Sequence, residues 1–287
     1  MSKMTDFMEN KLADLIRGQG LSALPANWYF ALGSAGTDSS FTELTGTGYG
    51  RVIQARSLTN FAGTQGVGTT LASFGTSHAT SNNSALNWGT SGSAWGTANV
   101  VGLFDAVTGG NCWMVYTLGT PIVIGSGAAV NIAAAGVAFT LGLTGGLTDY
   151  AANKLVDLIW RAQAYTWPSN LYASLFTTAP SNAGGGTEVG AADYARVAIA
   201  SSLSAWSGTQ AAASTVASTG TAGRISNNGP VTYPTPTTNW GAVTHEGLKD
   251  AATAGTLMFW GALAAARTVN IGLLQSHAAD SLAITLA

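Results

Sequence analysis

Residues 10–32 read NKLADLIRGQGLSALPANWYFAL, and residues 153–175 read NKLVDLIWRAQAYTWPSNLYASL. Both stretches contain Asn-Lys-Leu, then Asp-Leu-Ile, then a proline, an asparagine and a tyrosine, and the matching positions lie 143 apart (153 minus 10). Self-similarity at a fixed spacing is the signature of a repeated structural unit. The two stretches therefore predict that the chain contains two copies of one fold.

The duplication continues to the end of the chain. After a two-residue insertion the separation becomes 145, and it holds for charged, aromatic and turn residues. The later pairs include Glu43/Glu188, Arg51/Arg196, Trp95/Trp240, Asp105/Asp250 and Thr140/Thr285. We therefore expect a first domain at residues 1–142, a Gly-rich linker at 143–148 and a second domain at 149–287.

Each copy is expected to open with a short amphipathic helix. In the first copy Asp6 and Glu9 have the spacing of an N-cap and its reciprocal acid, and Gly18 is the expected stop. In the second copy the cap is Thr148 or Asp149. The apolar stripes that predict the two helices are Met8, Leu12, Leu15 and Ile16, and Ala152, Leu155, Leu158 and Ile159.

Strand character follows each helix. Residues 28–32 and 171–176 are aromatic and apolar. Residues 100–118 predict a hairpin around a Gly-rich turn, and residues 247–263 predict its twin. Many short strands separated by turn residues are typical of an all-β sandwich or barrel. The expected fold class is therefore mainly β, with two tandem β-sandwich domains, each preceded by a short N-terminal α-helix.

The composition excludes several classes of protein. Only 8% of the 287 residues are charged, the formal net charge is −2 and the pI is about 5.8. An electrostatic nucleic-acid binder needs a basic patch and a high pI, so we expect no nucleic-acid partner. A single cysteine excludes an internal disulfide and a Cys-based zinc site. The many aromatic residues argue against disorder.

A membrane-spanning segment is not expected either. The N-terminal residues lack the apolar stretch of a signal peptide. The uncharged run at 118–143 is interrupted by Gly119, Pro121 and further glycines. Such a run predicts short strands separated by turns, among them 122–124, rather than a spanning helix.

The repeated charged residues are the main site candidates. In a chain so poor in charge, Glu43 and Arg51, and likewise Glu188 and Arg196, are expected to form structural ion pairs, with a partner contact as the alternative. Asp105 and Asp250 open Gly-rich turns, where a carboxylate usually accepts backbone amide hydrogen bonds; a catalytic carboxylate is the alternative.

Other chemistry-bearing residues form no recognisable catalytic set. The three histidines, His78, His245 and His277, have no shared metal-ligand spacing, so no metal and no cofactor are expected. Cys112 is expected to be a small buried residue. Three tryptophans are expected to anchor the core, with sugar-stacking platforms as the alternative: Trp95, Trp206 and Trp240. No catalytic residue is assigned.

The second copy resembles a family of small virion proteins of tailed bacteriophages, described as tail fibre or head decoration proteins. The resemblance rests on the segments at 153–155, 171–180, 186–189, 194–197 and 240–251. It covers most of residues 149–287 and is weaker over 6–142. It implies a virion protein with β-sandwich units similar to jelly-roll cement proteins, an analogy of fold alone.

Three functions follow from these observations. The leading hypothesis is a non-enzymatic capsid decoration or cement protein on the outer capsid surface. Its partners would be the major capsid protein lattice and neighbouring copies of itself, and the duplication would act as a two-fold clamp. The alternative is a tail fibre or receptor-binding protein of the phage tail. An enzyme such as a depolymerase is the third, disfavoured because acidic residues are scarce.

Overall fold

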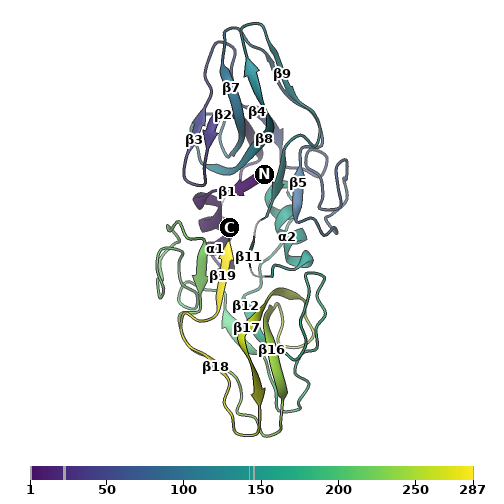
Figure 1. Ribbon diagram of the computed structural model, residues 1–287, viewed down its shortest axis with the longest axis vertical. Coiled ribbons are helices and arrows are strands. Elements are labelled where there is room, and N and C mark those ends of the chain that lie inside the picture. Colours follow the sequence, from purple (N-terminus) through teal and green to yellow (C-terminus); the bar gives the residue numbers. More distant parts are fainter. Residues whose placement is uncertain (1, 22–23, 142, 145, 287) are drawn as a thin grey trace.

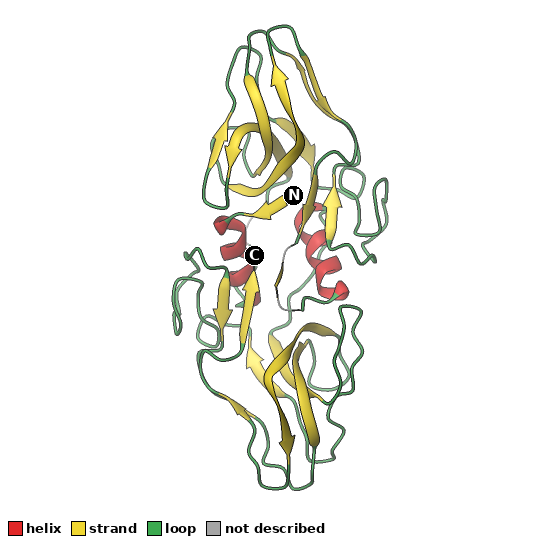
Figure 2. Ribbon diagram, in the orientation of Figure 1, coloured by secondary structure: helices red, strands yellow, loops and turns green. Residues whose placement is uncertain are grey.

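The computed structural model describes residues 2–21, 24–141, 143–144 and 146–286. The molecule is elongated, with a β-rich half at each end and two helices at the waist (Figures 1 and 2). The first repeat forms the upper half in this view and the second forms the lower half. Both chain ends lie at the waist. The two halves are related by an approximate two-fold arrangement about the waist, as a duplication allows.

The first repeat contains one helix and ten strands among its described residues. Its main antiparallel sheet has the order β1-β8-β7-β2-β3, with β4 also paired to β2, and two smaller sheets pair β5 with β10 and β6 with β9. The elements are β1 (Ser2–Met4), α1 (Asp6–Ile16), β2 (Asn27–Gly36), β3 (Phe41–Glu43), β4 (Val52–Ala55), β5 (Ala79–Ser81), β6 (Leu86–Thr90), β7 (Gly96–Phe104), β8 (Cys112–Ile124), β9 (Ala129–Ile132) and β10 (Ala138–Thr140).

The second repeat has the same plan. Its main sheet has the order β13-β12-β16-β17, which corresponds to β4-β2-β7-β8 of the first repeat. The elements are β11 (Leu143–Thr144), α2 (Asp149–Trp160), β12 (Asn170–Phe176), β13 (Val197–Ala200), β14 (Arg224–Ser226), β15 (Val231–Thr232), β16 (Gly241–Lys249), β17 (Leu257–Val269), β18 (Ser276–His277) and β19 (Ala283–Leu286). The predicted mainly β class with one helix at the start of each repeat is confirmed.

The N-cap of α1 lies one residue before the expected position. Thr5 is the N-cap of α1, because its hydroxyl accepts the backbone N–H of Met8, so the expectation of an Asp6 cap is wrong. Thr148 caps α2 in the same way by accepting from Ala151. A threonine cap leaves Asp6 and Asp149 in the first turn, where a carboxylate favours the helix dipole.

The expected break near Gly119 and Pro121 is also wrong. β8 runs from Cys112 through both residues to Ile124. The register with β7 shifts here, since Ala98 pairs with Ile122 whereas Val100 pairs with Thr117. A β-bulge accommodates a proline because the bulged residues need not donate to the ladder.

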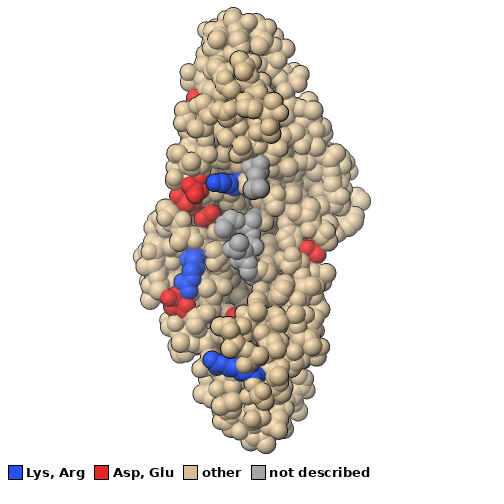
Figure 3. Space-filling view, in the orientation of Figure 1, with Lys and Arg blue, Asp and Glu red and all other residues tan. Residues whose placement is uncertain are grey.

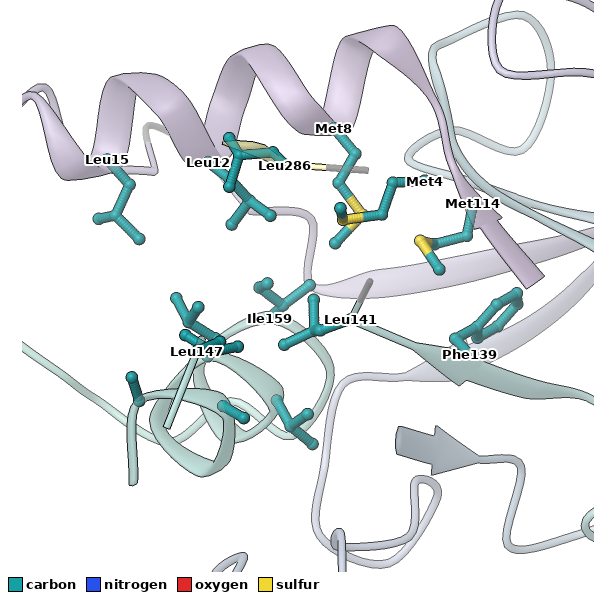
Figure 4. Close-up of a cluster of buried hydrophobic side chains, with 14 of the residues drawn as sticks. Met4, Met8, Leu12, Leu15, Met114, Phe139, Leu141, Leu147, Ile159 and Leu286 are labelled. Atoms are coloured by element: carbon teal, nitrogen blue, oxygen red, sulfur yellow. The ribbon is translucent and has the colours of Figure 1, made fainter. Parts of the chain in front are cut away.

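Each helix packs against both repeats: α1 against β8 of its own and β19 of the other, and α2 against β17 of its own and β5 of the other. In the close-up, Met8, Leu12 and Leu15 of α1 point toward Leu147 and Ile159 of the second repeat (Figure 4). These side chains belong to one continuous cluster of buried residues that includes both main sheets. The two repeats therefore share a single core at the waist.

The junction between the repeats takes part in this core. Leu143–Thr144 pairs antiparallel with β19 at the C-terminal end, and Leu147 forms a bridge with Phe259. Gly145, inside the expected linker, and Gly142, the last residue of the expected first domain, lie outside the described residues. No helix in the described ranges is long and apolar enough to cross a membrane.

Candidate functional site

Each helix ends in a buried arginine that is bound by the other repeat. Arg17 follows α1 and is fully buried. Its guanidinium donates to the Trp206 carbonyl at 3.0 Å, the Ser214 carbonyl at 3.1 Å and the Ser218 hydroxyl at 3.0 Å, all in the second repeat. Asp14 of the same helix completes the set at 2.9 Å. Burial lowers the pKa of Arg17, and this carboxylate opposes the shift.

Arg161 repeats the arrangement in the opposite direction. It follows α2, is fully buried and donates to the carbonyls of Phe61, Thr69 and Leu71 in the first repeat, at 3.0, 3.2 and 2.5 Å. Asp157 pairs with it at 2.5 Å. The acceptor loops are related by the 145-residue offset, so the two arginine sites are true counterparts.

Further polar contacts accompany the exchanged helices. Asn10 in α1 accepts from Thr209, and Asn153 in α2 accepts from Thr64. Trp28 in β2 donates its indole N–H to the Ile159 carbonyl at 3.2 Å. Since buried polar groups are costly when unpaired, each loop stabilises the C-terminal end of the helix of the opposite repeat, whereas the threonine cap at the start of each helix donates to carbonyls of its own repeat.

The two sides of the waist differ in charge. On one side His78 of the first repeat contacts Asp149 at the start of α2, with Nε2 2.7 Å from Oδ1. On the other side Gly223 occupies the position equivalent to His78, and Glu9 of α1 lies directly over it. Burial, followed by repulsion from Asp6 and Asp38, raises the pKa of Glu9 to about 7.

The repeated Glu and Arg candidates are brought together in both copies. Arg51 Nη2 lies 2.7 Å from Glu43 Oε2, Nε donates to the same carboxylate, and Nη1 donates to the carbonyls of Ala106 and Gly109. The guanidinium also stacks on Phe104, 3.7 Å from the ring centroid. Tyr49 donates to the same carboxylate at 2.9 Å. The arginine thus ties the β3 edge to the turn between β7 and β8.

The second copy has the same cluster with one addition. Arg196 Nε lies 2.7 Å from Glu188 Oε1, and Nη1 donates to the carbonyls of Ala251 and Ala254. Lys249 adds a second cation 3.0 Å from Glu188 Oε2. Burial would raise the pKa of Glu188, but the hydrogen bonds and charges of Arg196 and Lys249 lower it.

Asp105 and Asp250 lie in the turns that these arginines hold. Asp105 accepts the backbone N–H of Asn111 at 2.7 Å, and Asp250 accepts that of Thr256 at 2.6 Å. Each carboxylate closes its hairpin loop, as expected of a turn-forming residue. Asp105 also accepts the indole N–H of Trp113.

The remaining candidates lie apart from one another. Trp95, Trp206 and Trp240 are at most 5% exposed, so none offers a free ring face. Cys112 is half-buried rather than fully buried, and burial raises the pKa of its thiol to about 12. Within the described residues, no group of three or more His, Cys, Asp or Glu is arranged to hold a metal ion.

Charged side chains are gathered at the waist. On the face shown in Figure 3, acidic and basic side chains lie mainly around the middle of the molecule, and the two ends are almost free of charge. On this face the two ends therefore present almost only uncharged side chains. Contacts made through such surfaces depend little on salt.

Sequence reasoning missed Arg17 and Arg161. A signal was present: each follows an aspartate by three or four residues in a charge-poor helix, the spacing of neighbours on one helical face. A charged residue repeated at the end of two apolar helices indicates a buried partner elsewhere in the chain.

Comparison with protein families matches these two structural units. The family described as podophage GP4 fiber I protein gp80 matches the chain twice, over residues 3–140 and 146–285. The chain belongs to this fibre family. The two matches cover nearly the whole sequence and coincide with the two repeats, so the expected kinship with duplicated phage virion proteins is confirmed. No curated protein matches the chain. The family description favours the fibre hypothesis over the capsid decoration hypothesis.

Proposed function

We propose that this protein is a non-enzymatic structural component of a phage tail fibre. The observation that carries the proposal is the double match to a podophage fibre family. The waist supports it mechanically, because the reciprocal arginine sites and the shared core join two β-rich halves into one elongated body. A fibre segment needs such resistance to bending and separation.

The chemistry of the arginine clusters fits the same role. Arg51 and Arg196 are fully occupied by carboxylates and backbone carbonyls of their own repeat. Groups held in this way stabilise loops and are not available to transfer protons or activate a nucleophile. The partners proposed here are other virion proteins of the tail and further copies of this chain, with no catalytic step.

The proposal is tested by locating the protein on purified particles. Antibody-linked gold particles should label the tail and leave the capsid faces bare. Quantitative mass spectrometry should find far fewer copies per particle than of the major capsid protein. Labelling spread over the capsid, with copy numbers close to that of the capsid protein, would instead establish the decoration hypothesis.

A further inference from the structure

The second repeat contains a cavity of about 720 Å³ between β16, β17 and the segment that includes β18. Its polar lining residues are Tyr233, Glu246, Arg267, Gln275, Ser276, His277 and Ser281. A volume of this size lies in the range of small-molecule pockets. None of these residues belongs to the waist or to the arginine clusters.

The duplication provides an internal comparison for this cavity. At the 145-residue offset the first repeat has large apolar residues at five of the seven polar positions, and Asn131 and Gly136 stand at the other two. These are Trp88 for Tyr233, Val101 for Glu246, Ile122 for Arg267, Val130 for Gln275 and Ile132 for His277. Four of the five are buried in the core of the first repeat. The same fold therefore forms with an apolar filling, and the polar set is particular to the second repeat.

Two of the polar groups lack a hydrogen-bond partner inside the described structure. Tyr233 is 2% exposed, and its hydroxyl makes no hydrogen bond. Glu246 Oε2 lies 2.9 Å from His277 Nε2 but is not aligned for a hydrogen bond. Burial raises the pKa of Tyr233 well above its usual value, so the phenol stays protonated and can donate. Unpaired buried groups are costly, and a ligand that pairs with them removes that cost.

A cation without a partner lies on the wall of the same cavity. Arg267 is exposed on β17, where it faces Val243 in the register. It makes no ion pair or hydrogen bond with the described residues, whereas the arginines of the waist and of the two repeated clusters are paired. Glu246 follows Val243 by three residues, so the backbone positions of Arg267 and Glu246 are roughly 10 Å apart along the strand.

We propose that this cavity binds a short acidic saccharide that contains a uronic acid. The Arg267 guanidinium pairs with the sugar carboxylate, since its planar fork suits that group. The Glu246 carboxylate accepts hydrogen bonds from ring hydroxyls, and the Tyr233 hydroxyl bonds to a further ring oxygen. The spacing of the two positions along the strand suits a ligand of about two sugar rings.

The donor and acceptor content of the cavity favours a sugar. A carboxylate only accepts hydrogen bonds, a guanidinium only donates them, and hydroxyls do both. A ligand that satisfies all three over a short span carries many hydroxyls and one acidic group. The inference rests on the proposed function to the extent that a fibre protein meets saccharides on a cell surface.

The test measures binding of defined disaccharides to the full chain by saturation-transfer NMR and calorimetry. The probes are α-1,4-digalacturonate and glucuronosyl-β-1,3-N-acetylglucosamine, with α-1,4-galactobiose and glucosyl-β-1,3-N-acetylglucosamine as their neutral counterparts. We expect at least one uronate to bind, and to bind at least tenfold more tightly than its neutral counterpart. Absence of binding by both uronates overturns the proposal.

The first repeat supplies the variants. The double variant Glu246→Val/His277→Ile installs the residues of the first repeat and removes both members of that ion pair together. Tyr233→Trp fills the cavity with the larger first-repeat side chain. Each should abolish binding at an unchanged melting temperature. If the double variant does not fold, Tyr233→Trp alone decides. Arg267→Ala should remove the preference for the uronate. Binding that survives Tyr233→Trp overturns the proposal.

The two proposals fail independently. Gold labelling reports where the protein lies on the particle and does not depend on the cavity. Tail labelling without saccharide binding rejects only the ligand, and saccharide binding with capsid labelling rejects only the fibre role.

Discussion

Replacing Arg161 with methionine removes the central contact of one helix exchange while keeping much of the side-chain volume. The guanidinium donates to three carbonyls of the first repeat, to the Ser73 hydroxyl and to Asp157. The variant leaves the Asp157 carboxylate buried, with Ser73 as its remaining partner. Removal of one member of a buried ion pair costs about 3–5 kcal/mol.

The assay is thermal unfolding compared with a matched surface variant. For a protein of this size, a loss of about 4 kcal/mol lowers the melting temperature by roughly 10 °C. Arg224→Met is the control, because Arg224 and Asp280 form an ion pair whose side chains are 39% and 49% exposed. Such a surface pair contributes about 1 kcal/mol or less. Arg17→Met, at the counterpart site, should match Arg161→Met.

Hydrogen exchange locates the effect. In Arg161→Met, faster exchange should appear at residues 62–77 of the first repeat, although the substitution lies in the second. Arg17→Met should loosen residues 207–220 instead. Two results would refute this account: the same melting temperature for Arg161→Met and the Arg224→Met control, or faster hydrogen exchange only within the repeat that carries the substitution. In either case the reciprocal contacts of the two helices are not what holds the waist together.

Three further predictions concern the charged residues. Glu9→Gln should raise the melting temperature by several degrees at pH 8 and leave it unchanged at pH 4. The folded pKa of Glu9, about 7, exceeds the unfolded value of 4.5, so its ionisation opposes folding increasingly from pH 4.5 to 7 and fully above pH 7. Equal gains at both pH values would contradict this. Arg51→Ala should lower the free energy of unfolding, measured with denaturant, by about 2–3 kcal/mol, and Arg196→Ala should lower it by about 1 kcal/mol. The difference arises because Lys249 still neutralises Glu188, whereas the uncharged Phe104 stands at the equivalent position beside Glu43. The reverse order would be inconsistent with this account. Because the folded pKa of Glu188 is lowered, its contribution to stability should be present above the unfolded pKa near 4.5 and disappear as the pH falls through the folded value. Glu188→Gln should therefore have a lower melting temperature than the wild type at pH 7 and the same melting temperature at pH 2.

The sequence was sufficient to predict the two helices and the paired hairpins, but not the full length of β8 or the exchange of the helix ends between the repeats. The stripe of Met8, Leu12 and Leu15 and the paired hairpins follow local periodicity, which a sequence displays directly. The partner loops of the two helices are both present in the sequence and contain the same Gly-Thr-Gln, at 63–65 and 208–210. Because the two loops are chemically alike, no local pattern indicates which of them a helix occupies.

The cavity of the second repeat was hidden for a different reason. Tyr233, Glu246 and His277 come from three separated segments, and none forms a motif with its neighbours in the chain. A comparison of the two copies would have found them. Where one copy has a polar residue and the equivalent core position of the other has an apolar one, packing alone does not determine the side chain. The repeated Glu and Arg were found because both copies contain them.

The reciprocal exchange also sets the order of events on the ribosome. The groups that bind Arg17 are residues 206–218, which are synthesised about 200 positions later. At 5–20 residues per second the nascent helix waits about 10–40 s for its site. The first repeat therefore cannot reach its final state during its own synthesis, and both halves complete their folding together, after the second set of loops has left the exit tunnel.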